Sequence, residues 1–215
     1  MIRAFQANRF LILLCTIMVL FLMSPIAKQL GLKTALLLLD AAFTFVFLAS
    51  VYAVSRNRRR FIIGSILLVP TISLTWIDPF IFNATVQTAM TWVLLLFFAF
   101  IIYGITTYVL GIDEVTLEQV AGTLCVYLLI GLLWSLAYSL IEIYFPASFS
   151  KTDMAFFDFN YFSFVTLTTL GYGDISPVST VARAFAIVEA ILGQFFLAVL
   201  VARQVGLYIS SSQHR

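Results

Sequence analysis

The sequence predicts an all-α membrane protein with six transmembrane helices, and three observations support that fold class. Of the 215 residues, 62% are hydrophobic and 10% are charged. The mean hydropathy is +1.07, far above that of a soluble domain of this size. The apolar residues also gather into runs of about 20, the length that a helix needs to cross the hydrocarbon core. Together these features exclude a soluble globular domain.

Six apolar segments are expected to span the membrane. The first and third are short for a span, and Pro25 and Pro70 add a bend or an end to them. Cys15 and Cys125 fall inside helices, so we expect buried, small apolar side chains rather than a disulfide or a metal pair. The expected spans are Phe10–Ile26, Ala35–Ser55, Phe61–Ile77, Val86–Leu110, Val120–Tyr144 and Val181–Tyr208.

Lys and Arg are distributed unevenly between the two sides of this predicted membrane. Eight of the 12 lie on one side, which the positive-inside rule makes cytoplasmic. We therefore expect a multi-pass protein of a plasma or inner membrane, with both termini cytoplasmic. The cluster from Arg56 to Arg60 sets this topology and could also hold anionic lipid head groups. The eight are Arg3, Arg9, Arg56, Arg58, Arg59, Arg60, Arg203 and Arg215, against Lys28, Lys33, Lys151 and Arg183.

A polar, glycine-containing segment lies between the fifth and sixth spans, where residues 166–174 read T-L-T-T-L-G-Y-G-D. Carbonyls on an extended strand point to alternate sides, and glycine adopts the positive φ that turns them to one side. Before the segment, Phe159–Thr168 is an aromatic stretch typical of a short helix, with Asp158 as its N-cap. Non-helical backbone at membrane depth needs protein or water around it, so we expect a re-entrant pore helix and loop.

Thr169–Gly173 resembles the selectivity filter of the potassium channel superfamily, usually T-V-G-Y-G with an aliphatic residue tolerated second. A bare G-x-G marks many ordinary turns, but here five residues match in register and Asp174 follows. The resemblance implies a homotetramer, because each subunit supplies one loop to every ring of ion-coordinating oxygens. It implies K⁺ coordination by the carbonyls of Thr169, Leu170, Gly171 and Tyr172 and by the Thr169 hydroxyl, with Gly173 completing the filter and Asp174 at the outer mouth.

Two further positions are expected to support the filter from the pore helix, Thr168 and Tyr161. In the resembling family, tryptophans that hydrogen-bond around the filter tyrosine commonly occupy the positions of Tyr161 and Phe162. Phe162 has no hydrogen-bonding group, so we expect looser packing around Tyr172.

The last span carries two more candidates. Gly193 lies 19 residues after Asp174, which is the spacing of the family's hinge glycine; close helix packing by a small residue is the alternative. Glu189 is an ionisable group within a membrane segment and therefore needs a cavity or a partner. It faces the pore cavity and attracts cations, or it braces the back of the pore helix and filter. Gln194 is a candidate for lining the cavity.

The chain divides into a four-helix bundle (1–110), a cytoplasmic interfacial linker (111–119), a pore domain (120–208) and a short cytoplasmic tail (209–215). The bundle occupies the place of a voltage sensor, but Val86–Leu110 has no charged residue, so strong voltage gating is not expected. It is expected to serve as a structural collar or as a sensor of lipid or tension. The acidic linker is a short coupling helix or a solvated connector, and the tail is too short for an appended ligand-binding domain.

These features together predict a potassium-selective channel that conducts K⁺ passively, with K⁺ as permeant ion, no cofactor and membrane lipids as partners. A nonselective cation channel of the same fold is the main alternative, and a non-conducting subunit is another. A secondary transporter would show internal repeats, of which we find no second copy. Nothing indicates an enzyme, since the only histidine is His214 and no catalytic cluster is present. A net charge of +2 indicates no nucleic-acid partner.

Overall fold

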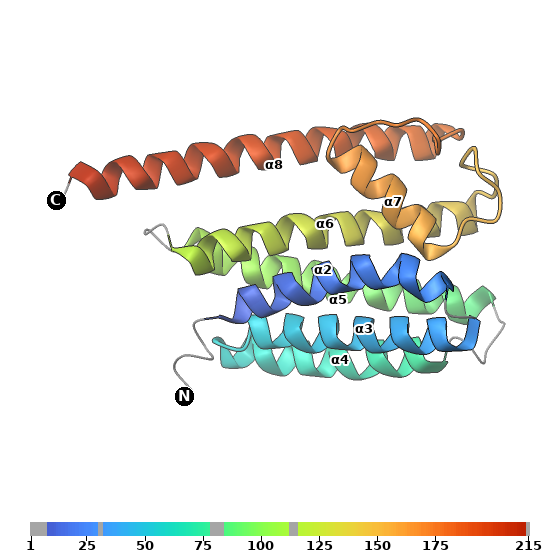
Figure 1. Cartoon of the computed structure of the whole chain (residues 1–215), viewed down its shortest axis with the longest axis horizontal. Coiled ribbons are helices and arrows are strands. Elements are labelled where there is room, and N and C mark those ends of the chain that lie inside the picture. Colours follow the sequence, from blue (N-terminus) through green and yellow to red (C-terminus); the bar gives the residue numbers. More distant parts are fainter. Residues whose placement is uncertain (1–7, 30–31, 78–83, 112–115, 214–215) are drawn as a thin grey trace. The chain divides into compact units, whose positions relative to one another are not determined.

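A computed structural model of the chain describes residues 8–29, 32–77, 84–111 and 116–213. In this part of the chain the regular structure is helical, apart from one isolated bridge between Phe149 and Pro177. The helices in chain order are α2 (Arg9–Gln29), α3 (Leu32–Ala53), α4 (Arg58–Ile77), α5 (Ala84–Leu110), α6 (Leu117–Tyr144), α7 (Phe156–Leu167) and α8 (Thr180–Gln213) (Figure 1).

Within the described residues, four helices are apolar and long enough to cross a membrane. They are Arg58–Ile77, Thr85–Leu110, Leu117–Tyr144 and Thr180–Leu200. Shorter apolar stretches lie in α2 and α3, at Arg9–Met23 and Leu37–Ala53. The fold is therefore that of an all-α membrane protein, while the expected total of six spans stays a prediction.

Most of the expected spans begin or end one to five residues away from the helices of the structure, and two of these differences bear on the linker and the tail. The helix α6 begins at Leu117 rather than Val120, because the Thr116 hydroxyl accepts the Gln119 backbone N–H at 3.1 Å and Glu118 lies in the first turn, where an acid is favourable. The end of the expected linker is thus helical, whereas its Asp113 and Glu114 lie outside the described residues. At the other end of the chain α8 continues to Gln213, through most of the expected tail.

The described residues form two compact units, and α6 contributes to both. Its residues up to Val126 belong to the first unit, with α2 to α5, and those from Tyr127 onward belong to the second, with α7 and α8. In the first unit α3 packs between α2 and α4, and α4 packs on α5. Aromatic rings fill its centre: Phe47 and Phe97 meet edge to face at 5.5 Å, and Phe97 and Phe98 at 5.7 Å.

The two cysteines differ in exposure. Cys125 is buried and its thiol donates to the Phe10 carbonyl at 3.3 Å, as a small core residue would. The expectation that Cys15 is also buried was wrong: Cys15 is exposed. It lies on α2 opposite the buried face of Leu13 and Ile17, and a membrane helix can present such an apolar side chain to lipid.

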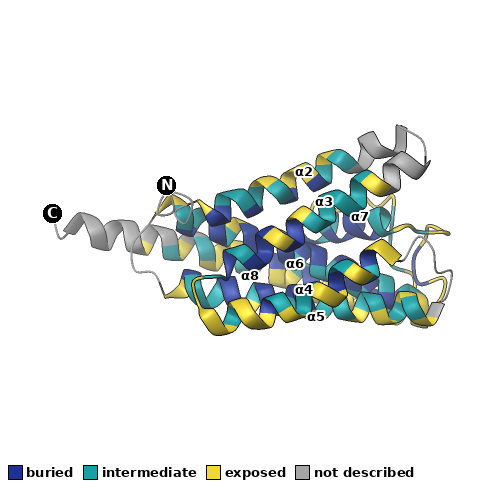
Figure 2. Cartoon of the chain, turned by 90° about the horizontal axis from the view of Figure 1, so that it is seen from below, coloured by how far each residue is buried: buried dark blue, intermediate teal, exposed yellow. Residues whose placement is uncertain are grey.

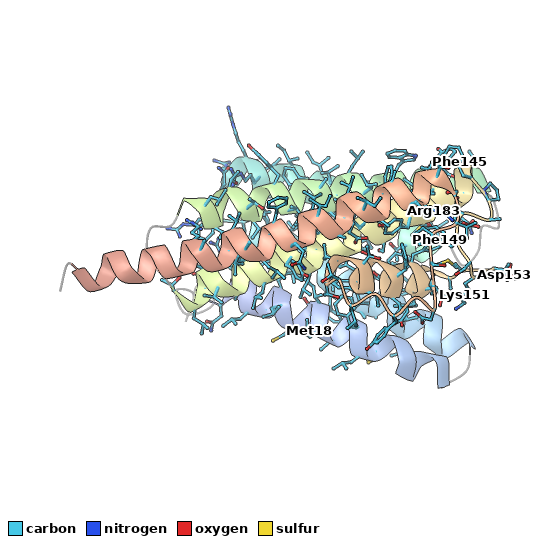
Figure 3. The ribbon with its side chains drawn as sticks, turned by 90° about the horizontal axis from the view of Figure 1, so that it is seen from above. Met18, Phe145, Phe149, Lys151, Asp153 and Arg183 are labelled. Carbon is cyan, nitrogen blue, oxygen red and sulfur yellow. The ribbon has the colours of Figure 1, made fainter. Side chains whose placement is uncertain are left out.

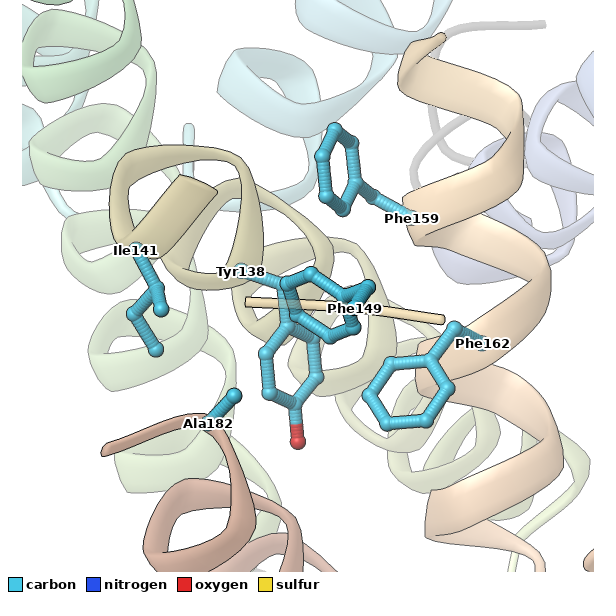
Figure 4. Packing of buried hydrophobic residues seen from close by; sticks show 6 residues of the cluster. All are labelled: Tyr138, Ile141, Phe149, Phe159, Phe162 and Ala182. Atoms are coloured by element: carbon cyan, nitrogen blue, oxygen red, sulfur yellow. The ribbon is translucent and has the colours of Figure 1, made fainter. Parts of the chain in front are cut away.

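The second unit is built around a cluster of aromatic side chains. Tyr138 of α6 meets Phe162 of α7 at 4.8 Å, and Phe149, from the loop before α7, meets Phe162 at 5.2 Å (Figure 4). The full cluster is Tyr138, Ile141, Phe149, Phe159, Phe162 and Ala182. These side chains come from α6, α7, α8 and one loop, so the cluster packs the short helix α7 against both of its neighbouring helices.

The loops on either side of α7 pair with each other. The Ser150 N–H donates to the Ser176 carbonyl at 2.9 Å, and the Val178 N–H donates to the Ser148 carbonyl at 2.7 Å. Phe149 and Lys151 of the first loop lie at the same end of the unit as Arg183 (Figure 3). The paired loops therefore hold together the two ends of the chain segment that contains α7 and the residues after it.

Exposed residues recur along α4 and α5 (Figure 2), and much of the described part of α8 is likewise uncovered within the chain. Its exposed side chains include Ile187 at 62%, Phe195 at 64% and Val199 at 62%. Large apolar side chains in such number require lipid or another protein surface against them.

Candidate functional site

The glycine-containing segment follows α7 directly. Ala155 is the N-cap of α7, and Asp158 is its third helical residue, so the prediction of Asp158 as N-cap was wrong. The Asp158 carboxylate accepts a hydrogen bond from the Ala155 backbone N–H at 2.9 Å and forms an ion pair with Lys151 at 2.6 Å. An acid in the first turn stabilises the helix start in the same way as a cap.

The backbone of this segment alternates in handedness. Thr169, Gly171 and Gly173 have φ of 57°, 60° and 78°, while Leu170 and Tyr172 between them do not have positive φ. Alternating left-handed residues turn carbonyls that would otherwise point to opposite sides toward the same side. The segment can thus present a row of carbonyl oxygens, as a filter requires.

Thr169 was not expected in the left-handed region, which is rare for a β-branched residue. Local hydrogen bonds support it there. Its N–H donates to the Thr166 carbonyl at 2.9 Å, its hydroxyl lies 2.7 Å from the Thr168 carbonyl, and Gln194 of α8 donates to that hydroxyl at 3.1 Å. Gln194 therefore holds the Thr169 end of the segment.

The start of the segment is also bonded back to α7. The N–H groups of Leu170 and Gly171 point to the Val165 carbonyl at 2.9 and 3.3 Å. Thr168 is the C-cap of α7, and its hydroxyl donates to the Phe164 carbonyl at 2.6 Å. These bonds use the free carbonyls at the helix end and fix the direction in which the segment leaves it.

At the other end of the segment, the Tyr172 ring stacks nearly parallel to the Tyr161 ring of α7, with the ring centroids 6.5 Å apart. A hydrogen bond to the Asp174 carboxylate raises the pKa of the Tyr161 phenol. Tyr161 thus contacts two residues of the segment. Phe162, in contrast, is buried in the aromatic cluster around Tyr138.

Every residue from Thr168 to Asp174 is exposed in the single chain. Leu170 is 56% exposed and Tyr172 is 67% exposed, although both have large apolar bodies. The segment is therefore uncovered within the single chain, and its large apolar side chains require lipid or another protein surface against them.

Glu189 of α8 lies behind α7 and is fully buried, with 0% exposure. The Tyr138 hydroxyl of α6 donates to one carboxyl oxygen at 2.5 Å, and the Ser163 hydroxyl of α7 lies 2.5 Å from the other. One side chain thus joins three helices. Of the two placements expected for Glu189, this geometry favours the brace over the cavity.

Ser163 also lies 2.8 Å from the Gly131 carbonyl. A hydroxyl carries one proton, so Ser163 can donate either to Glu189 or to Gly131. All of these contacts become hydrogen bonds when the Glu189 carboxyl carries a proton, since it then donates to Ser163 and Ser163 donates to Gly131. A neutral Glu189 also avoids an unpaired buried charge.

Gly193 lies where α8 meets the end of α7. A Cβ atom at Gly193 would lie 2.1 Å from the Leu167 carbonyl oxygen, far inside contact distance. A Cβ atom at Gly131 of α6 would likewise lie 2.5 Å from the Phe164 ring. This geometry favours close packing as the reason for Gly193, and α8 runs through it as one helix.

Four of these contacts were not predicted: Tyr138 and Ser163 as partners of Glu189, Gln194 as the partner of Thr169, and the close approach at Gly131. A signal was present for the first two, because each places a hydroxyl within an apolar helix. No signal paired them with Glu189, since the three residues come from separate helices.

A family model described as "Ion channel" matches residues 122–208, which include the later part of α6, all of α7 and most of α8. No curated protein and no solved structure matches the chain.

Replacing Glu189 tests the brace. Glu189→Gln keeps an acceptor for Tyr138 and gains an N–H donor for Ser163, so we expect nearly unchanged stability. Glu189→Ala leaves buried hydroxyls unpaired and a cavity, which lowers the free energy of unfolding by about 2–4 kcal/mol. Thermal unfolding of the purified full-length protein measures both. If Gln proves as harmful as Ala, the carboxylate charge matters and the cavity placement regains support.

Replacing Gly193 with Ala tests the close packing, with Gly206→Ala on the same helix as its control. A Cβ at Gly206 meets no described atom within 4 Å. Both changes raise helix propensity by about 1 kcal/mol, but only Gly193→Ala forces α8 away from Leu167, at a cost of about 1–3 kcal/mol. We expect a lower unfolding temperature for Gly193→Ala alone. Equal stability of the two variants, with altered channel opening only in the first, would favour a hinge.

Proposed function

We propose that the chain, whose residues 122–208 match the family model described as "Ion channel", is a potassium-selective channel that conducts K⁺ passively through a tetrameric pore. The observation that carries this proposal is the alternation of φ at Thr169, Gly171 and Gly173 in a T-L-G-Y-G-D segment.

The chemistry of the proposal lies in the carbonyl oxygens. A K⁺ ion crossing a bilayer must shed water, and rings of carbonyls from four loops replace its hydration shell. The alternating backbone supports a row of such oxygens from Thr169, Leu170, Gly171 and Tyr172, with the Thr169 hydroxyl at the inner end. Asp174 would then lie at the outer mouth, bonded to Tyr161.

The tetramer has support from two uncovered surfaces. The filter segment is exposed in one chain, and so is the apolar face of α8 around Phe195. Fourfold association would cover the backs of the filter segments and aim their carbonyls at one axis. We propose a homotetramer for this reason.

The remaining expectations complete the proposal. The four long apolar helices, with the shorter stretches of α2 and α3, are consistent with six spans, and α7 would be a re-entrant pore helix. The excess of Arg on one side supports cytoplasmic termini in a plasma or inner membrane. The uncharged α5 argues against a moving charged sensor.

The behaviour of the brace would decide how rigid this filter is. Phe162 does not bond the filter tyrosine, so Tyr161 alone on α7 stacks on Tyr172. In the proposal, Glu189 and Gly193 hold α7 from behind and compensate for the missing bond.

A nonselective cation channel of the same fold is the second candidate function. It is favoured because α7 supports Tyr172 only through the stacked ring of Tyr161, and a filter with fewer lateral supports loses carbonyl geometry more readily. The intact glycine pattern favours potassium.

The reversal potential in a planar bilayer tests the proposal. The K⁺ concentration differs tenfold across the bilayer, and Na⁺ keeps the total cation concentration equal on both sides. The current through a potassium-selective pore then reverses at about 59 mV in magnitude, with the side of higher K⁺ negative. A nonselective pore reverses near zero, and that result would overturn the proposal and favour a nonselective cation channel.

Gly173→Ala tests whether this segment is the filter, with Gly206→Ala as its matched control. At a φ of 78° an alanine costs about 1–2 kcal/mol, so the carbonyl row is disturbed and selective current is lost. Gly206→Ala, in open space, should leave the reversal potential unchanged. Selective current through a Gly173→Ala channel would contradict the assignment of this segment as the filter.

A further inference from the structure

The first unit contains a cavity that the proposed function does not use. Its volume is about 460 Å³, and it lies where the start of α2, the turn between α3 and α4, and the end of α5 meet. Three of its lining residues are arginines, and the others include a tyrosine and a glycine backbone. The lining residues that bear on its chemistry are Arg9, Arg56, Asn57, Arg60, Gly104 and Tyr108.

The first arginine is held firmly and is already neutralised. Arg9 is 4% exposed and pairs with Glu118 of α6 at 2.9 Å. Its guanidinium also lies 4.2 Å from the centre of the Tyr108 ring. A cation fixed by an ion pair and an aromatic face forms a rigid wall rather than a free charge.

The other two arginines retain most of their donors. Arg56 donates to the Tyr108 hydroxyl at 3.0 Å, and Arg60 donates to the Gly104 carbonyl at 3.1 Å. A guanidinium has five N–H donors, so each uses only a small part of its capacity. Among the described residues neither has a carboxylate partner within ion-pair distance, so this part of the chain presents two unpaired positive charges to one cavity.

The start of α4 adds to this positive potential. The Asn57 side chain accepts the backbone N–H groups of Arg59 and Arg60 at 3.0 and 3.3 Å, which makes it the N-cap. The positive end of the helix dipole thus lies beside the cavity. Positive charges at a helix N-terminus are unfavourable unless an anion offsets them.

The chemistry of a suitable anion follows from these donors. Guanidinium forks bind phosphate oxygens bidentately, and a phosphate offers enough acceptors for two arginines and a tyrosine hydroxyl at once. Ala53 and Val54 give the cavity an apolar wall beside the arginines. By the positive-inside rule this end of the bundle meets the cytoplasmic leaflet, where anionic head groups concentrate.

We propose that this cavity binds a phosphate-bearing anion, such as an anionic lipid head group or a free phosphate. The ligand would bridge Arg56 and Arg60 above the wall that Arg9 and Tyr108 form. Because Arg9 is also paired with Glu118 at the start of α6, occupancy would stabilise the connection between α5 and α6.

The test uses the purified full-length protein in a nonionic detergent. Short-chain phosphatidic acid, inorganic phosphate and short-chain phosphatidylcholine are added separately, and the unfolding temperature and the bound mass by native mass spectrometry are recorded. We expect phosphatidic acid to raise the unfolding temperature and phosphatidylcholine to leave it unchanged. A shift with inorganic phosphate as well identifies a free phosphate as sufficient, and a shift with the lipid alone identifies the head group.

Two double variants remove equal charge from the same turn. Arg56→Gln with Arg60→Gln removes both cavity arginines, and we expect an apparent Kd for phosphatidic acid at least about tenfold higher. Arg58→Gln with Arg59→Gln removes exposed arginines that do not line the cavity, and the Kd should stay near the original value. Equal loss in both variants would indicate general charge attraction and overturn the proposal, as would no shift with either phosphate compound.

A second pair keeps the test valid if the loss of the Arg60 to Gly104 bond impairs folding. Arg56→Gln alone should weaken binding, while Arg58→Gln alone should not.

The chain's own acids are tested by neutralising Asp113 and Glu114 together. If phosphatidic acid binds only in that variant, the linker carboxylates occupy the arginines and the proposal fails.

Discussion

Backbone carbonyls without donors are tolerated in a membrane only where an ion, water or protein surrounds them. In the proposed channel this constraint would fall on the short stretch after α7, where Thr169, Gly171 and Gly173 have positive φ. Such a backbone is not stable by itself. It depends on α7 ending at the right place and on bonds to Val165 that set its direction. Much of the second unit can be understood as the support for this stretch.

That support works through contacts that need three helices at once. The Glu189 carboxyl is satisfied only when Tyr138 of α6 and Ser163 of α7 are both in place. Gly193 lets α8 approach the Leu167 backbone of α7 directly, and Gly131 leaves room on α6 for the Phe164 ring of α7. Buried polar groups are costly when unpaired, so a displaced α7 would lose hydrogen bonds on two sides. The aromatic cluster around Phe162 adds apolar packing at the other end of α7.

The first unit has a different character. Its centre is apolar, but one end collects arginines around a cavity, and the ion pair between Arg9 and Glu118 ties that end to the start of α6. Since α6 contributes to both units, a change at this end acts on the helix that also carries Tyr138.

The sequence by itself determined the membrane class, the helical content and the segment that ends α7, because apolar length and glycine φ are local properties. It also determined the left-handed positions at Gly171 and Gly173. Tertiary structure alone decided the left-handed Thr169, which depends on Gln194 from a distant helix. It likewise decided the partners of Glu189, the packing role of Gly193, the third-residue position of Asp158 and the exposed Cys15. Each of these depends on which residues from other helices or loops lie nearby, and a one-dimensional pattern carries no record of that.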